Sequence, residues 1–157
     1  GEGRLGEHFD IFSWHFFLMA NQPENIPFEL WRDPLGRWVD FFRDLLPEGC
    51  PMWVTEFGLP TKPDNSDTLH TRTGGTIYGL TEEEQADWFS AFVEAAGKEW
   101  GIDLLVWLML NDEEDPKNYY IHNTGLLRMD GTPKPIYQRM REVTDEPVRS
   151  GAAGGGH

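Results

Sequence analysis

The stretch PMWVTEFGLPT, residues 51–61, decides how the rest of the chain can fold. Its first part is an apolar run typical of a short buried strand, and Gly58 and Pro60 then end the strand and open a loop. Glu56 therefore lies at the end of the strand, near the rim of the sheet, where proteins with parallel sheets place their chemistry. Because a charged residue at a strand end usually just reaches solvent, this position makes Glu56 a candidate catalytic carboxylate and nothing more.

Two further apolar runs flank the central strand. Residues 9–19 form the first strand candidate, interrupted by three polar side chains, and residues 102–110 form the third. Runs that are almost continuously apolar suit strands that are covered on both faces.

Helix-like segments separate the three strands. The first covers residues 34–46, with Asp33 as its N-cap and a proline in its first position, and its apolar stripe is expected to pack in the core. The stripe consists of Leu35, Trp38, Val39, Phe42, Leu45 and Leu46. The second helix begins after Thr81, which forms a capping box with Glu84, and runs to about Glu99. Alternating strands and helices predict an α/β fold, with parallel strands joined by right-handed crossovers.

The remaining segments are predicted as loops and one last helix. Residues 58–80 form a long loop without regular structure, a length that is often found in functional lids. Asp130 and Gly131 form a tight turn. The last helix follows this turn, and its apolar side is supplied by Ile136, Tyr137, Met140 and Val143.

Composition limits the classes of partner. The 157 residues include 27 acidic and 13 basic side chains, for a formal net charge of −14. This balance argues against nucleic acid and anionic membranes as partners, since both require cationic surfaces. Aromatic residues make up 13% of the chain, with seven Trp, and such side chains serve as core residues or as platforms for flat sugar faces.

The sequence gives no reason to expect a metal or a cofactor. Cys50 is the only cysteine, so an internal disulfide is impossible, and the thiol is expected to be small and buried. The acidic run at residues 111–115 has the ligand type for Ca²⁺ but lacks the spacing of a known calcium-binding loop. Residues 147–157 are expected to be a flexible tail or linker, which leaves residues 1–146 as the folded unit.

Three motifs resemble strands of the (β/α)8-barrel retaining glycoside hydrolases, the clan that includes cellulases, mannanases and β-xylosidases. Residues 53–58, Trp-Val-Thr-Glu-Phe-Gly, resemble its seventh strand, which implies that Glu56 is the nucleophile. Ser13 and His15 match the Ser-x-His-x-Tyr pattern of its sixth strand, although Phe17 replaces the tyrosine. Trp107 resembles the eighth-strand tryptophan on which the clan stacks a sugar, with a core aromatic as the alternative.

The resemblance also implies how much of a fold is present. The segment Asp-Gly-Thr-Pro-Lys-Pro, residues 130–135, resembles the lead into the last barrel helix of these enzymes. The chain then corresponds to a partial (β/α)8 TIM barrel of about three C-terminal βα units, strands six to eight. A complete barrel needs about 200 residues or more, so an N-terminal barrel segment or a second chain is expected as a partner.

The function implied is retaining hydrolysis of a β-glycan or β-glycoside, by an enzyme that is incomplete in this chain alone. Retention requires two carboxyl groups about 5 to 5.5 Å apart, and the clan supplies the acid/base from an Asn-Glu pair after strand four, which has no counterpart here. His15 and Asn111 are candidates for contacts to the hydroxyl groups of an oligosaccharide or polysaccharide substrate. Secretion is the location that the resemblance favours.

Two other hypotheses remain open at this stage. One is a non-catalytic carbohydrate-binding or scaffold protein on a degenerate barrel, because fold resemblance does not establish activity. The absent acid/base and Phe17 favour it, whereas the intact Thr55-Glu56 pair and Trp107 argue against it. The other is a different half-barrel enzyme that works as an oligomer, for which the sequence contains no supporting motif.

Overall fold

The computed structural model describes residues 10–114, 117 and 119–145. Five strands and three α-helices follow one another along these residues, together with two short 3-10 helices at Pro23–Asn25 and Tyr120–Asn123. In chain order the elements are β1 (Phe12–Phe17), α1 (Glu29–Leu45), β2 (Met52–Gly58), β3 (Thr68–His70), β4 (Thr76–Tyr78), α2 (Glu82–Lys98), β5 (Leu104–Trp107) and α3 (Pro135–Asp145). The predicted α/β alternation is therefore confirmed.

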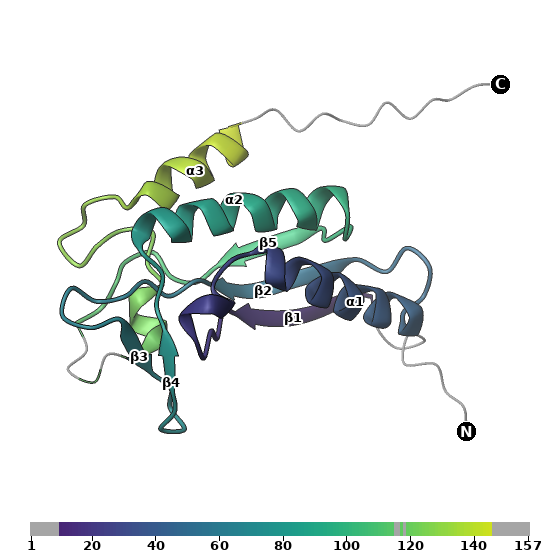
Figure 1. Ribbon diagram of the computed structural model, residues 1–157. Coiled ribbons are helices and arrows are strands. Elements are labelled where there is room, and N and C mark those ends of the chain that lie inside the picture. The colour runs from purple at the N-terminus through teal and green to yellow at the C-terminus, as the bar shows by residue number, and fades with distance from the viewer. Residues whose placement is uncertain (1–9, 115–116, 118, 146–157) are drawn as a thin grey trace.

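Strands β1, β2 and β5 form one parallel sheet in the order β1–β2–β5. The nucleophile candidate thus lies on the central strand, and β1 and β5 are the two edges. Helices α1 and α2 pack over the same face of the sheet, and α3 packs against α2 (Figure 1). The molecule therefore has a helical layer on one face, and the described residues place no helix on the other.

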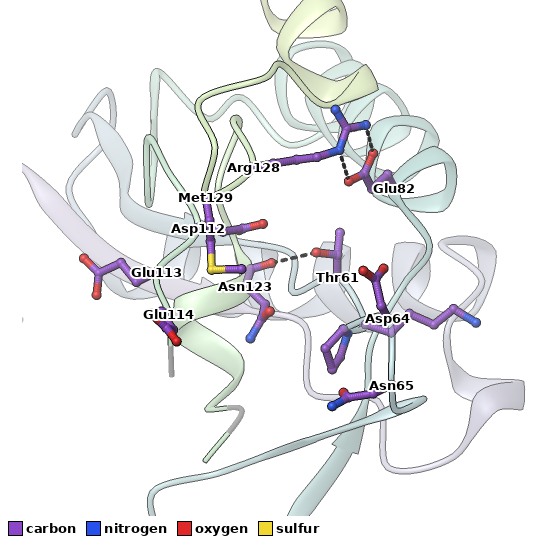
Figure 2. Close-up of a pocket in the computed structure, with 12 residues that line it drawn as sticks. Thr61, Asp64, Asn65, Glu82, Asp112, Glu113, Glu114, Asn123, Arg128 and Met129 are labelled. Carbon is purple, nitrogen blue, oxygen red and sulfur yellow. Dashed lines mark hydrogen bonds and ion pairs between the residues drawn. The ribbon is translucent and has the colours of Figure 1, made fainter. Parts of the chain in front are cut away.

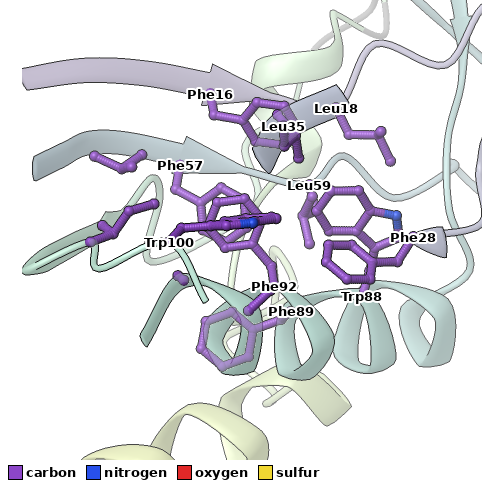
Figure 3. Packing of buried hydrophobic residues seen from close by; sticks show 14 of the residues in the cluster. Phe16, Leu18, Phe28, Leu35, Phe57, Leu59, Trp88, Phe89, Phe92 and Trp100 are labelled. Carbon is purple, nitrogen blue, oxygen red and sulfur yellow. The ribbon is translucent and has the colours of Figure 1, made fainter. Parts of the chain in front are cut away.

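A cluster of stacked aromatic rings joins the sheet to the helical layer (Figure 3). The Phe57 ring on β2 lies 4.2 Å from the Phe92 ring on α2, centroid to centroid, and Phe16 on β1 stacks on both Phe92 and Trp88. Aromatic pairs at such separations add to the free energy gained by burial. This cluster fixes the face of β1 and β2 that points inward, and hence the side chains that point outward.

Helix α1 begins earlier than the cap signals predict. It starts at Glu29, and Pro34 lies inside the helix instead of at its first position. Tertiary packing explains the difference: Phe28, just before the helix, is buried against the rings of Trp88 and Trp100. These contacts hold a turn of helix ahead of the proline, although the proline costs a backbone hydrogen bond.

The prediction that the whole apolar stripe of this helix is core was wrong. Leu35 and Val39 are buried, but Trp38 is 60% exposed and Leu45 41% exposed. Leu35 and Val39 point at the sheet, whereas Trp38 and Leu45 lie on another side of the helix and remain largely exposed among the described residues.

The long loop after β2 was predicted to have no regular structure, and this prediction was wrong. It contains the antiparallel hairpin β3–β4, in which Leu69 pairs with Ile77 and both are buried. The hairpin is tied back to the strand ends, because the Tyr78 amide donates to the Ala20 carbonyl and His70 forms a bridge with Tyr119. Figure 1 shows the hairpin extending beyond the arrowheads of the parallel strands.

Several local predictions are confirmed. Thr81 and Glu84 form the capping box of α2, with each side chain bonded to the other residue's backbone amide. Gly131 adopts a positive φ of 80° in the turn before α3, a conformation that glycine reaches without steric cost. Cys50 is buried and free.

The predicted tail at residues 147–157 lies outside the described residues, as does the start of the first predicted strand. Among the helices of the described part, none is long and apolar enough to cross a lipid bilayer.

Candidate active site

A β-bulge in β2 determines the direction of the Glu56 side chain. Trp14 of β1 pairs with Val54, but the next residue, His15, pairs with Glu56, so Thr55 is an extra residue on β2. Side chains alternate between faces along a regular strand, so Glu56 would share the buried face of Val54 if Thr55 took a regular place in the strand. The bulge instead buries Phe57, which is 1% exposed, and turns Glu56 to the open face. Bulges are often found beside active sites, where they re-aim a side chain.

His15 and Glu56 lie side by side on this open face. The His15 Nδ1 atom is 3.4 Å from Glu56 Oε2, and the two side chains are 54% and 40% exposed. This separation is longer than an ordinary hydrogen bond, but catalytic contacts in a site without substrate are often long. The structure thus brings together two of the four predicted site residues.

An aromatic pair lies next to these residues at the carboxyl end of β1. The Phe17 ring covers Gly58 so closely that a Cβ atom there would lie 2.7 Å from it, and Tyr120 packs edge-on against the same ring, with centroids 5.7 Å apart. Phe17 is two residues beyond His15 and so belongs to the same face. This pair was not among the predicted site residues, since Tyr120 is distant in sequence.

Trp107 is in a different environment from the one expected. It pairs with Phe57 across β2 and β5, and its ring packs edge-on against Phe57 and Phe89, on the helix-covered face. Its indole N–H donates to the Thr124 carbonyl at 2.9 Å. These contacts favour the core interpretation of Trp107, and sugar stacking by this residue stays a prediction.

Asn111 follows β5 and is half-buried, with its backbone bridged to Leu127. Among the described residues, no hydrogen bond joins its side chain to Glu56 or His15. Its predicted contact with a sugar hydroxyl also stays a prediction.

Next to Asn111, a buried ion pair ties three loops together. Lys134 Nζ is 2.6 Å from Asp112 Oδ2 and donates to Thr61 Oγ1 at 2.9 Å. The other Asp112 oxygen accepts from the Gly125 amide. Burial raises the pKa of Asp112 and lowers that of Lys134, and their mutual attraction opposes both shifts. The pair connects the loop after β2, the loop after β5 and the segment just before α3, where Lys134 is the lysine of Asp-Gly-Thr-Pro-Lys-Pro.

A cleft of about 500 Å³ opens beside this ion pair (Figure 2). Its walls include Thr61, Asp64, Glu82, Asp112, Asn123 and Arg128. Internal contacts occupy most of the charges, because Arg128 is paired with Glu82, and Glu113 lies 2.9 Å from His122 Nδ1. Within the described residues, no group of three or more His, Cys, Asp or Glu side chains is arranged to hold a metal ion.

The sequence predicts Glu56 and His15 as site residues but not the bulge that brings them together. In the folded strand, the buried residues shift from the even positions Met52 and Val54 to the odd position Phe57, and such a change of phase within one strand indicates a bulge. In the sequence, Trp53 is also apolar and hides this change. The Lys134–Asp112 pair leaves no sequence signal either, since the two residues belong to different loops.

Comparison with known proteins shows likeness in fold but not in sequence. No protein-family model matches the chain, and no curated protein is significantly similar to it. Among solved structures, a GH5_18 protein from Bifidobacterium longum, in complex with Manβ1-4GlcNAc, matches with a TM-score of 0.64 and 17% identity over 90% of this chain and 31% of its own. A β-glucuronidase from Bifidobacterium dentium matches with a TM-score of 0.59 and 18% identity, over 87% and 20% of the two chains.

A third structure, a GH2 β-galacturonidase from Eisenbergiella tayi, has a TM-score of 0.55 and 17% identity over 85% of this chain and 23% of its own. The chain thus spans between a fifth and a third of the length of these glycoside hydrolases. At such identities the likeness concerns the fold: a parallel α/β arrangement that also occurs within glycoside hydrolases.

Proposed function

We propose that this chain is the nucleophile-bearing part of a retaining β-glycoside hydrolase, corresponding to the last three βα units of a (β/α)8 barrel. The observation that carries the proposal is the bulge at Thr55, which turns Glu56 out of the core at the carboxyl end of a parallel sheet. Carboxyl ends of strands are where such folds place their catalytic groups. Glu56 is also the only acidic residue in β1, β2 and β5, so these strands offer no rival for the role.

In the proposed reaction, the Glu56 carboxylate attacks the anomeric carbon and forms a glycosyl ester as the glycosidic C–O bond breaks. The leaving oxygen takes a proton from a carboxylic acid on another barrel strand. Water, deprotonated by that carboxylate, then attacks the anomeric carbon, the bond to the Glu56 carboxylate breaks, and the sugar leaves with its original configuration. The acid/base belongs to the N-terminal barrel segment, which therefore completes both the fold and the site.

The other residues have supporting roles in this proposal. His15 orients Glu56 or contacts a substrate hydroxyl, and Asn111 is a second candidate for a hydroxyl contact. Phe17 and Tyr120 suit the apolar sugar platform better than Trp107 does, because Phe17 shares the face of Glu56 whereas Trp107 packs against Phe89. The fold neighbours include proteins named for β-glucuronide and β-galacturonide hydrolysis and one bound to Manβ1-4GlcNAc, so β-linked oligosaccharides and polysaccharides are the proposed substrate class.

The decisive experiment is covalent labelling in the polypeptide that contains the remaining barrel units. A panel of 2-deoxy-2-fluoro β-glycosides, covering glucosyl, mannosyl and glucuronyl sugars, should add one sugar mass to the peptide that carries Glu56. Glu56→Gln should abolish labelling and turnover with an unchanged circular dichroism spectrum, because the change removes charge but little volume. Labelling of another carboxylate would overturn the assignment.

The non-catalytic alternative is further favoured by the single acidic residue on the three parallel strands. The same experiment separates the two hypotheses. A carbohydrate-binding scaffold would retain oligosaccharides in calorimetry or affinity electrophoresis but would neither be labelled nor release an aryl group.

A further inference from the structure

Helix α1 carries two separate apolar stripes, and only one of them is used within the described residues. The inward stripe includes Leu35, Val39 and Phe42, which pack on the sheet. The second stripe consists of Leu30, Pro34, Trp38, Phe41 and Leu45, spaced by four, four, three and four residues. At about 100° per residue, these five side chains fall within a narrow sector that we call the outer stripe. Trp38 is 60% exposed and Phe41 58% exposed.

The outer stripe points away from α2. On the α2 side of the helix, Arg32 is paired with Glu99, and Gly36 lies against the Trp100 indole, 3.1 Å from where a Cβ would be. Arg32 and Gly36 lie about 180° around the helix from the outer stripe, by the helical repeat. Helix α2 connects β2 to β5, so it lies on the β5 side of α1. The opposite side of α1, which carries the outer stripe, therefore lies toward β1, whose outer edge is free.

A hollow of about 330 Å³ interrupts the outer stripe, lined by Pro34, Arg37, Trp38 and Phe41. It is large enough for a bulky apolar side chain. Arg37 at its rim forms no ion pair with any described residue. A surface with an apolar hollow, exposed aromatic rings and an unpaired cation at the rim has the character of a helix-packing interface.

We propose that the outer stripe of α1 is the docking surface for one further strand–helix unit of the same polypeptide, which lies N-terminal to β1. Its strand would pair in parallel with the free edge of β1, and its helix would lie along the outer stripe, with an apolar side chain in the hollow and an acidic residue opposite Arg37. The inference rests on the proposed barrel origin of the chain. A single strand–helix unit can cover both the β1 edge and the outer stripe. In a parallel α/β fold, units whose strands are neighbours in the sheet also have neighbouring helices.

Two observations favour this occupant over an unrelated protein. The free strand edge and the outer stripe lie on the same side of the molecule, and an isolated partner helix would leave the edge open, which native sheets avoid. The solved structures that share this fold are several times longer, since this chain covers only 31% and 20% of two of them.

The experiment compares hydroxyl-radical footprints of the 157-residue chain and of the polypeptide that includes the upstream barrel units. The short chain carries Val106→Lys, a charge on the open face that limits self-association. Trp38 and Phe41 should be oxidised readily in the short chain and several-fold more slowly in the longer polypeptide. Trp88, which is 3% exposed, should react slowly in both, and Met129, which is 65% exposed and lies at the cleft, should react readily in both.

Variants in the longer polypeptide provide a second readout. Phe41→Lys should restore Trp38 oxidation several-fold, whereas Asp40→Ala, a neighbouring exposed position outside the stripe, should leave it unchanged. Equal oxidation of Trp38 in both proteins would overturn the inference, as would a discrete dimer of the short chain that protects Trp38 to the same degree.

An aryl-glycoside assay on the same samples separates this inference from the proposed function. Turnover with an unprotected Trp38 would refute the docking surface and leave the glycosidase proposal intact. Protection of Trp38 without turnover or labelling of Glu56 would refute the catalytic proposal and leave the docking surface intact.

Discussion

At the scale of residues, Lys134 and Asp112 form the ion pair with the least solvent exposure among the described residues, with side chains 1% and 13% exposed. Burying two charges is costly, and the pair is tolerable because each charge has further hydrogen-bond partners, Thr61 for Lys134 and the Gly125 amide for Asp112. The network holds together the loops that follow β2 and β5, and these loops border the candidate site.

Lys134→Met should lower the free energy of unfolding by about 3–5 kcal/mol, because it leaves the Asp112 charge buried without its partner. The double variant Asp112→Asn/Lys134→Met should lose clearly less, since no charge is left unpaired. Urea unfolding of the wild type and the variants measures both effects. Equal losses in the single and double variants would contradict the role of the charge.

The effect of Lys134→Met should depend on pH in a defined direction. Burial already raises the pKa of Asp112, and loss of the lysine removes the attraction that opposes this rise. A carboxyl group with a raised folded pKa contributes stability that is fully present below its unfolded pKa of about 3.9 and is lost as the pH rises through the folded value. The destabilisation should therefore be smaller near pH 4 than at pH 7, and the double variant should show no such trend.

Trp107→Phe tests whether this tryptophan is a core residue or a sugar platform. Loss of the hydrogen bond to the Thr124 carbonyl, together with a smaller ring against Phe57 and Phe89, should lower stability by about 1–3 kcal/mol. Oligosaccharide affinity should change little if packing is its main role. Thermal unfolding and calorimetric titration of the same protein distinguish the two roles, and weaker binding at unchanged stability would favour the platform.

At the scale of elements, strand β2 shows how one inserted residue changes the chemistry of a sheet. Its buried side chains are Met52, Val54 and Phe57, and only the bulge at Thr55 reconciles these positions with a single inward face. The aromatic cluster on α2 supplies the driving force, since Phe57 gains a stacked contact with Phe92 that Glu56 could not make. Glu56 is thus turned outward because its neighbour is pulled inward.

Deletion of Thr55 should preserve the faces of Glu56 and Phe57, because it removes the extra residue of the bulge. Regular alternation after Val54 then leaves Glu56 on the open face and Phe57 in the core. Thr55→Ala keeps the bulge and should change stability by less than about 1 kcal/mol. Circular dichroism melting of both variants measures these effects, and a deletion variant without a cooperative transition would rule out this account of the bulge.

At the scale of the whole molecule, the layer architecture is one-sided. The helices cover one face of the sheet, whereas Ile11, Leu104 and Val106 remain 38%, 38% and 42% exposed on or beside the other. The strand edges of β1 and β5 are also free within the described residues. Open edges and exposed apolar residues recruit further strands.

The 157-residue chain alone should therefore self-associate rather than persist as an 18.1 kDa monomer. Sedimentation should show larger species, a hydrophobic dye should bind, and aryl-glycoside turnover should be absent because the acid/base is missing. Val106→Lys should shift the population toward the monomer without loss of helical signal. A cooperative, monomeric and active chain would show that the architecture is complete without further barrel units.

Features that depend on neighbouring residues could be predicted from the sequence. The strand–helix alternation, the capping box at Thr81, the turn at Gly131 and the position of Glu56 near a strand end all follow from periodicity and local backbone preference. Such signals need only residues within a turn or two of one another. The parallel α/β fold was predictable for the same reason.

Features that depend on contacts between distant segments appeared only in the folded chain. The direction of Glu56 depends on packing between β2 and α2, and the exposed position of Trp38 depends on what lies beside α1. The buried Lys134–Asp112 pair joins segments on either side of the last loops. The spacing of apolar residues predicts which side chains share one face of an element. It does not predict which other residues cover that face, because those residues come from distant parts of the sequence.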